Sequence, residues 1–355
     1  MTDRAGMVDW GLAASTARRL VRPGPEVSAS EAAEVVAELR EGAARSEQPV
    51  RDRTGLHARS ASAPVLVVDR RGWVTSSVEG FATVLDPLVT KIAEQSSSPP
   101  GVVARTVGAK VSGAELGALL AFMSGKILGQ FDPFWDGPAG STGRMLLVAP
   151  NIVTVEREMG VDPHDFRMWV CLHEETHRVQ FTAVPWLRDH LTSLLGSFVG
   201  ATDVDPANVG KLLGDGVTEL GRVLRGVEGA SITDVLQNPA QKEAVDAMTG
   251  VMSLLEGHAD VVMDEVGPEV VPSVRKIRKR FEQRRDGAGG LDSLLRRLLG
   301  LDAKMRQYRD GAAFVRRVTR DVGHEGFNAV WESPASLPSR EEILDPALWV
   351  QRVHG

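Results

Sequence analysis

The segment His173-Glu174-Glu175-Thr176-His177 limits the possible structures of this chain more than any other part of its sequence. Two histidines four residues apart lie one turn from each other on the same face of an α-helix. Both imidazoles can then reach one zinc ion at about 2.0–2.1 Å. Glu174 follows the first histidine and can accept a proton from water held at an open position of such an ion. The sequence therefore predicts that this segment is helical and borders a metal site.

The residues around this segment predict the helix itself. Asp162 can cap its N-terminus and Pro163 suits the first helical position, so we expect a helix from about Pro163 to Phe181. Apolar residues on both sides of the motif, such as Trp169, are typical of a helix that packs on a core. The alternative is a chance match, because a short pattern is only a hypothesis until its structural context fits.

A catalytic zinc site usually has three protein ligands and one open position, so a third ligand is needed. The segment 254–260 offers Glu256 and Asp260, four residues apart and on one helical face. We expect Glu256 to bind the metal and Asp260 to accept the free N–H of a metal-binding histidine, which would fix its orientation. His258 points to the other side of the helix and is a weaker candidate. Without the two histidines, Glu256 and Asp260 would be interpreted as an ordinary solvated helix face.

These residues predict a hydrolytic centre. Zinc lowers the pKa of bound water to about 7 and polarises a carbonyl group. We expect Glu174 to act as the general base and to pass the proton to a leaving amine. A further donor should stabilise the oxyanion, and the candidates are Tyr308 and His324. The alternatives are a core tyrosine for Tyr308 and a structural or surface role for His324.

Composition excludes several other classes of protein. A chain of 355 residues with 43% apolar and 25% charged residues can bury a substantial core. The net charge of −6 provides no overall positive field for nucleic acid or an anionic membrane. The single cysteine, Cys171, excludes an intrachain disulfide and a cysteine-based zinc cluster, and indicates a reducing compartment. We find neither a signal peptide nor a membrane-spanning run, so we expect a cytoplasmic protein without a membrane partner.

The patterns along the chain predict a mainly α-helical fold with a small β-sheet (α+β). We expect residues 1–100 to pack on a catalytic region of residues 101–355, as one continuous unit. The predicted strands are Pro64–Asp69 and Met145–Ala149, with Trp73–Ser76 as a possible partner, and the predicted loops include residues 45–62 and 130–143. The principal further helices are expected at Val111–Gln130, where small residues would let another helix approach closely, at Gln241–Asp264 and at Asp302–Val322.

The chain resembles known zinc enzymes in the residues described above. The motif His173-Glu174-x-x-His177 followed by Glu256-x-x-x-Asp260 is similar to that of the gluzincin branch of zinc metallopeptidases. The resemblance implies His173, His177 and Glu256 as ligands, Glu174 as base and Asp260 as the support of a ligand. Two features depart from the branch: Glu175 is charged, and the gap between His177 and Glu256 is long.

Over most of its length, the chain more closely resembles the zincin-2-type zinc-dependent hydrolases of actinobacteria. That resemblance implies a mostly helical, zincin-like metallopeptidase architecture. Some members are described as associated with biosynthesis of the deazaflavin coenzyme. The resembling stretches are Leu116–Gln130, Leu146–Ile152, Phe166–Trp186, Leu254–Asp264, Gln307–Gly311 and Phe327–Arg352.

Three functions are therefore compared. The first is a zinc-dependent hydrolase that cleaves a peptide or another amide. The second is a zinc-binding scaffold or assembly factor without catalytic activity. The third is a nucleic-acid adaptor that uses the basic run Arg275–Arg280, although such runs are usually solvated helix faces and the acidic net charge argues against it. The residues favour the first, and they indicate neither the substrate nor the oligomeric state.

Overall fold

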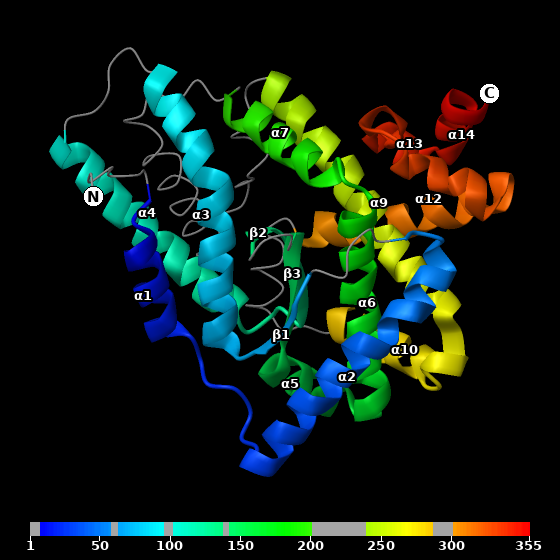
Figure 1. Ribbon diagram of the computed structural model, residues 1–355, viewed down its shortest axis with the longest axis horizontal. Coiled ribbons are helices and arrows are strands. Elements are labelled where there is room, and N and C mark those ends of the chain that lie inside the picture. The colour runs from blue at the N-terminus through cyan, green and yellow to red at the C-terminus, as the bar shows by residue number, and fades with distance from the viewer. Residues whose placement is uncertain (1–7, 58–62, 96–101, 138–141, 201–238, 287–300) are drawn as a thin grey trace.

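The computed structural model describes residues 8–57, 63–95, 102–137, 142–200, 239–286 and 301–355. Helices dominate this part of the chain and surround a small three-stranded sheet, which confirms the predicted fold class (Figure 1). The elements up to the sheet are α1 (Trp10–Leu20), α2 (Ala29–Thr54), β1 (Val65–Val68), α3 (Arg70–Gln95), α4 (Val102–Met123), β2 (Gly129–Asp136) and β3 (Thr142–Val148). The later elements are α5 (Ala149–Met159), α6 (Pro163–Ala183), α7 (Leu187–Gly200), α9 (Pro239–Val270), α10 (Val274–Asp286), α12 (Leu301–Phe327), η2 (Asn328–Trp331), η3 (Pro334–Ser336), α13 (Arg340–Leu344) and α14 (Pro346–His354).

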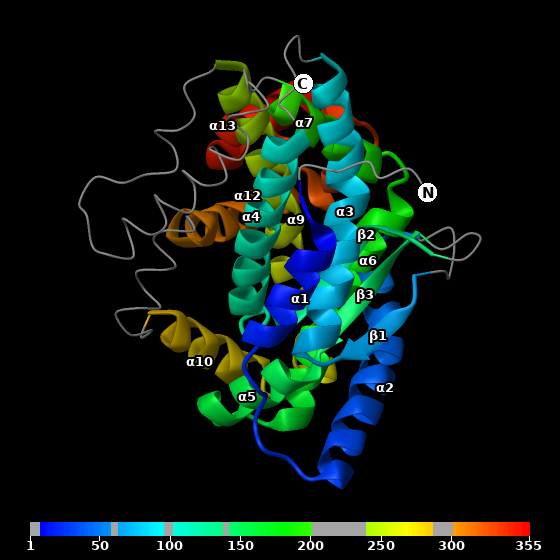
Figure 2. The same cartoon turned by 90° about the vertical axis from the view of Figure 1, so that its left-hand side faces the viewer.

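Strand β3 lies in the middle of the sheet, parallel to β1 and antiparallel to β2. Its side chains alternate between two buried faces, which explains its unbroken apolar run. Leu146 and Val148 pack in a cluster with Trp73 of α3 and Leu120 of α4. Met145 and Leu147 belong to the main core, which includes α6. The sheet therefore separates α1, α3 and α4, seen together in Figure 2, from α6 and the helices behind it.

Two segments predicted as loops are regular structure. Helix α2 continues to Thr54, through Pro49, because its apolar stripe extends to the fully buried Val50, and Gly55 ends it at a φ of 62°. Residues 129–136 form β2, because pairing with β3 supplies backbone hydrogen bonds. Pro133 and the glycines near it are typical of loops, so the sequence does not indicate this pairing. Pro133 has no backbone N–H to donate to β3, and the register of the β2–β3 pairing shifts between Asp132 and Asp136.

The predicted strand at residues 73–76 is wrong, because these residues belong to helix α3. The carboxylate of Asp69 accepts a hydrogen bond from the N–H of Gly72 at 2.7 Å, in the first turn of this helix. Trp73 and Val74 are then buried in the cluster beneath α1 and α4. Helical packing of these apolar residues outweighs their β-propensity.

Helix α4 starts earlier than predicted and ends at Met123, but its small residues act as expected. A Cβ atom on Gly113 would lie 2.4 Å from the carbonyl oxygen of Asp9, and one on Gly117 would lie 2.6 Å from that of Ala13. Among the described residues, the stretch Thr106–Met123 has the length and hydropathy of a membrane span, with 33% of it buried. In the fold, this helix packs against α1.

Helices α9 and α12 approach each other at a pair of glycines. A Cβ atom on Gly257 would lie 2.1 Å from the carbonyl carbon of Gly311, and one on Gly311 would lie 1.9 Å from the carbonyl oxygen of Ser253. Such a contact brings two helix backbones together, which any larger side chain prevents. The position of α9, which carries Glu256, therefore depends on these two residues.

We predict that Gly311→Ala lowers the free energy of unfolding by about 3 kcal/mol or more, because two backbones must separate to admit one methyl group. Urea unfolding followed by circular dichroism measures this. Gly108→Ala on α4 is the matched control: no atom lies within 4 Å of its added Cβ, so it should stabilise the protein by about 0.5–1 kcal/mol. Equal stability of the two variants would contradict the close contact.

Candidate metal centre

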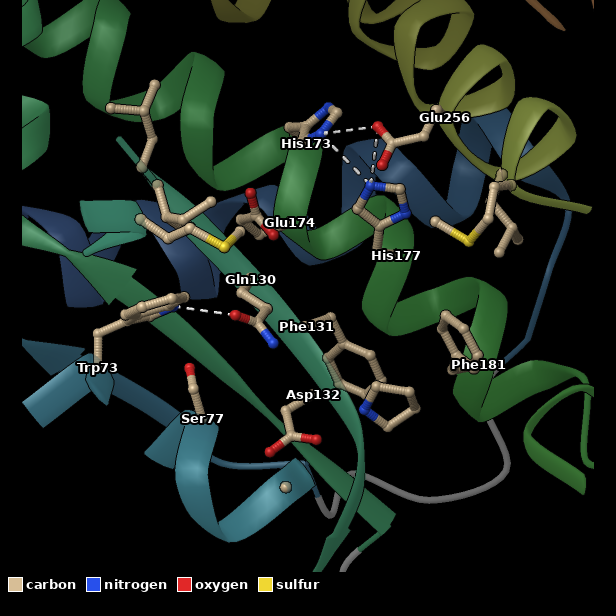
Figure 3. Close-up of a pocket in the computed structure, with 18 of the residues that line it drawn as sticks. Trp73, Ser77, Gln130, Phe131, Asp132, His173, Glu174, His177, Phe181 and Glu256 are labelled. Atoms are coloured by element: carbon tan, nitrogen blue, oxygen red, sulfur yellow. Dashed lines mark hydrogen bonds and ion pairs between the residues drawn. The ribbon is translucent and has the colours of Figure 1, made fainter. Parts of the chain in front are cut away.

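Helix α6 carries the predicted motif, and its start is the predicted one. The carboxylate of Asp162 accepts a hydrogen bond from the N–H of Asp165 at 3.0 Å, and Pro163 occupies the first turn. The helix ends at Ala183, so His173 and His177 lie in its central turns. Figure 3 shows both imidazoles on one side of α6, pointing toward Glu256, which comes from the neighbouring helix α9.

The donor atoms of these three side chains form a nearly equilateral triangle. The Nε2 atoms of His173 and His177 are 3.3 Å apart. The Oε2 atom of Glu256 lies 3.6 Å from the first and 3.7 Å from the second. Two ligands bound at about 2.0–2.1 Å to a tetrahedral ion are about 3.3–3.4 Å apart. The nitrogen and oxygen atoms therefore fit one metal ion of the size and preference of zinc.

The side chain of Gln180, which the sequence interpretation did not select, connects the two helices of this site. Its Nε2 donates to the carbonyl oxygen of Leu255 at 3.0 Å, directly before Glu256 on α9. Its Oε1 is consequently the acceptor, and Nδ1 of His177 donates to it at 2.9 Å. A proton on Nδ1 leaves Nε2 of His177 free to bind a metal. The signal in the sequence was the spacing of three residues from His177, which places both on one helical face.

The same amide also reaches His258. Its Nε2 lies 3.0 Å from Nδ1 of His258, which accepts, because an amide nitrogen can only donate. Burial and the charges of His324 and His177 lower the pKa of His258 to about 3, so its ring is neutral. The neutral ring packs 5.4 Å from the ring of Phe327 and 5.3 Å from that of Trp331. Gln180 thus lies between His258 and His177, and His258 is not one of the three clustered donors, as expected for a residue that does not bind the metal.

Asp260 does not make the predicted hydrogen bond to a histidine of the cluster. Its carboxylate lies 3.5 Å from the guanidinium group of Arg278 on α10, which also pairs with Asp264. The Nδ1 atom of His173 is buried without a hydrogen-bond partner, and that of His177 donates to Gln180. Asp260 still lines the cavity that contains the cluster. Attraction to Arg278 therefore holds this carboxylate near α10.

Glu174 is held between α6 and strand β2. It is 5% exposed, and a backbone hydrogen bond from Phe131 reaches its carboxylate. A Cβ atom on Gly129 would lie 2.5 Å from Cγ of Glu174, so only glycine leaves room for this side chain. Burial raises the pKa of Glu174 to about 8, although the charge of His177 lowers it in part. A carboxyl group with a pKa near neutrality suits proton transfer.

The two histidines have opposite pKa shifts. Burial and the charge of His177 lower the pKa of His173 to about 4. Burial also lowers the pKa of His177, but the carboxylates of Glu256 and Glu174 outweigh it and raise the value to about 9. Without a metal ion, a proton on His177 therefore neutralises Glu256. A bound cation must displace this proton, because a metal ligand is a neutral imidazole.

Glu175, the charged residue that departs from the gluzincin pattern, faces away from the cluster. It is fully buried and forms a bidentate pair with Arg178, with both contacts at 2.7 Å. Arg178 in turn lies 3.2 Å from Glu47 of α2. Cys171 also faces α2, where its thiol lies 3.6 Å from the carbonyl oxygen of Leu39, and it is a core residue as expected. The outer face of α6 is thus used for packing.

The structure tests only one of the two candidates for oxyanion stabilisation. The side chain of Tyr308 lies outside the described residues, so its role stays a prediction. His324 does not line the cavity of the cluster among the described residues. Its ring packs 6.5 Å from that of Phe327, at the far end of α12. The structure therefore joins His173, Glu174, His177, Glu256 and Asp260 around one cavity and leaves His324 outside it.

Comparison with known proteins agrees with this geometry. A family described as zincin-like metallopeptidases matches residues 8–350. Among solved structures, the chain is similar to a crystallised protein from Chloroflexus aurantiacus, provisionally described as a hydrolase with a novel fold. The two share 29% sequence identity and a TM-score of 0.68, over 98% of this chain and 99% of the other. No curated protein matches the sequence at a significant level.

We predict that Gln180→Ala weakens zinc binding by about 10- to 100-fold, because His177 loses its acceptor and α9 loses a tether. Competition with a fluorescent zinc chelator measures this affinity. Gln48→Ala is the control, since Gln48 is exposed on α2 and bonds only Asp52 among the described residues. Equal zinc affinity in the two variants would show that the bridge does not support the site.

We predict a pH-dependent effect of Glu174→Gln on the stability of the metal-free protein. The folded state holds the proton of Glu174 up to about pH 8, whereas the unfolded chain releases it near the ordinary value for glutamate. Ionisation of Glu174 therefore destabilises the fold as pH rises through this window. In the presence of a chelator, the variant should be more stable than the parent at about pH 9, with the difference declining toward about pH 5.

Urea unfolding midpoints at the two pH values test this prediction. Glu325→Gln is the control, because Glu325 is exposed on α12. A gain in stability from Glu174→Gln that is largest at low pH would contradict the buried, protonated carboxyl group.

Proposed function

Because the chain belongs to the zincin-like metallopeptidase family, we propose that it is a zinc-dependent hydrolase that cleaves a peptide or another amide. The observation that carries this proposal is the triangle of donor atoms, with sides of 3.3, 3.6 and 3.7 Å, beside a buried glutamate. Three protein donors leave one position of a tetrahedral ion open. Glu174 follows His173 directly and lines the same cavity, which supports a role beside that position.

In this proposal His173, His177 and Glu256 hold the zinc ion. When bound, zinc acts as a Lewis acid that polarises a carbonyl group and lowers the pKa of water to about 7. Glu174 accepts a proton from the attacking water at its carboxylate and delivers it to the departing nitrogen. The amide C–N bond breaks, the oxygen of water remains in the new carboxyl group, and the amine leaves with the proton.

The surroundings of Glu174 support its role as the base. The Phe131 N–H and the absence of a side chain at Gly129 fix its carboxylate against β2. Burial keeps solvent from competing for the proton. Tyr308 remains the predicted donor to the oxyanion. Gln180 orients His177 through a hydrogen bond from its Nδ1. These features position the base and one ligand before any substrate binds.

Several finer expectations stay predictions. They are an actinobacterial source, an association with biosynthesis of the deazaflavin coenzyme and a cytoplasmic location. The same holds for the expectation that neither a membrane nor a nucleic acid is a partner. In the fold, the basic run at residues 275–280 belongs to α10, where Ile277 is buried and Arg278 pairs with acids of α9. This arrangement supports a packed, solvated helix.

Metal analysis of purified variants tests the proposal. We expect one equivalent of zinc in the parent protein and loss of most of it in His177→Ala and Glu256→Gln. Glu174→Gln should keep the metal and lower the rate of amide hydrolysis by at least about 100-fold. Glu341→Gln on the exposed face of α13 is the control for both measurements.

The possible outcomes separate the alternatives. Zinc retained in both ligand variants would show that the triangle is not the metal site. Zinc lost as expected, with cellular function unchanged in Glu174→Gln, would identify a zinc-binding scaffold or assembly factor in place of a hydrolase.

A further inference from the structure

The cavity that contains the candidate metal centre is much larger than the reacting atoms require. Its volume is about 870 Å³, near the upper end of the roughly 300–1,000 Å³ that ligand pockets span. Its lining residues come from α3, α4, β2, α6, α7, α9 and α10. A pocket of this size accommodates a drug-sized molecule.

The wall formed by α3, α4 and α7 is apolar. One of its residues, Phe81, is 44% exposed and lies where the cavity reaches the surface. Burial of apolar surface in such a region is favourable, and the region offers water few hydrogen-bond partners. The apolar side chains of this wall include Phe81, Val84, Leu85, Leu120, Met123 and Leu195.

Two hydrogen-bond donors lie beside this apolar wall, one on α3 and one on β2. The hydroxyl of Ser77 is buried, with 3% of the residue exposed, and has no hydrogen-bond partner. One helical turn earlier, the indole N–H of Trp73 donates to Oε1 of Gln130 at 2.9 Å. This bond fixes the amide, so that its Nε2 is the group left to donate into the cavity. Figure 3 shows Trp73 and Ser77 across from the histidines and Glu256, with Gln130 between the two groups.

Charge also limits the occupant. Among the described lining residues, Lys126 is the only lysine or arginine, and its ammonium group lies 5.8 Å from the ring centre of Phe122. Asp132, a lining residue on β2, pairs with Arg144 at 3.2 Å. Four carboxyl groups line the cavity beside this one lysine, those of Asp132, Glu174, Glu256 and Asp260. An anionic group in the apolar region would therefore lose its hydration in a cavity whose lining carries more acidic than basic side chains. The walls favour an uncharged ligand that carries a hydrogen-bond acceptor.

We propose that the substrate is an uncharged amide with a large apolar group, and that this group occupies the region between α3, α4 and α7. Both an acyl chain and two adjacent apolar side chains of a peptide would provide such an apolar group. An acceptor oxygen on the group meets Ser77 and Gln130, while the amide bond lies at the metal centre. The cleavage step rests on the function proposed above, but binding of the apolar group does not need the metal.

Straight-chain hydroxamates, which bind zinc through a constant head group, test the proposal in the zinc-loaded protein. Calorimetry of acetohydroxamate, hexanohydroxamate and decanohydroxamate should show affinity that increases about three- to fourfold per methylene until the region is filled. A decanohydroxamate analogue with an ether oxygen in its chain adds the acceptor. Ser77→Ala should weaken binding of this analogue by about two- to tenfold and leave the affinity for decanohydroxamate unchanged. Ser76→Ala, the control, should weaken binding of neither compound.

The metal-free protein provides an independent measurement. The neutral fluorophore N-phenyl-1-naphthylamine should bind, and N-octylacetamide should displace it. Leu195→Trp fills part of the cavity and should weaken both ligands at least tenfold. Leu348→Trp on α14 adds the same indole at an exposed position, where 41% of the residue is accessible, and should change neither affinity. If Leu195→Trp fails to fold, the hydroxamate series still tests the proposal, because it is measured in the parent protein.

The outcomes of the two arms are distinguishable. Failure of the protein to bind zinc would overturn the proposed function, and the metal-free displacement would still decide this inference. Zinc binding with equal affinity for all three hydroxamates, and no fluorophore binding, would overturn the inference and leave the hydrolase proposal intact. Faster cleavage of decanoyl alaninamide than of a capped peptide with adjacent leucines would identify the acyl chain as the source of the apolar group, and the reverse would identify the peptide.

Discussion

The close approach of helix α9 to helix α6 is the constraint on which the candidate centre depends. Three donor atoms that would otherwise be hydrated must stay within 3.7 Å of one another. The fold supplies two contacts that hold them there: the amide of Gln180, which bonds the carbonyl oxygen of Leu255, and the contact between Gly257 and Gly311 on the outer side of α9. The centre is therefore organised by neutral hydrogen bonds and backbone packing, which do not require the metal.

Two adjacent glutamates on α6 show how the fold separates chemistry from packing. Glu175 points toward α2, where Arg178 compensates its charge through two hydrogen bonds. Glu174, one residue earlier and rotated by about 100°, points into the cavity with a single backbone donor, and burial raises its pKa to about 8. A buried carboxylate with a full complement of partners stabilises structure, whereas one with few partners remains available for proton transfer.

The sequence predicted the parts of this site that depend on local spacing. The i, i+4 histidines and the Asp162 cap follow from helical periodicity, and the choice of Glu256 follows from the need for a third ligand; the structure has the cap and the cluster of three donors. It did not predict strand β2, because Pro133 and the nearby glycines are typical of loops and the stabilising hydrogen bonds come from β3. Nor did it identify the ligand support, because Asp260 pairs with Arg278 of α10, and Gln180 is the partner of His177.

Strand β2 connects the hydrolytic centre with the apolar region of the cavity. Gly129 makes room for Glu174, and the backbone of Phe131 donates to it. Between them, Gln130 points its amide toward Trp73 and the apolar wall. Three consecutive residues of one edge strand thus fix the base and a substrate-facing donor relative to each other, at the rise of about 3.3 Å per residue that strand geometry sets. A substrate held by Gln130 is consequently positioned relative to Glu174 by the backbone of β2, so the spacing between its acceptor oxygen and its cleaved amide is the property that this strand selects.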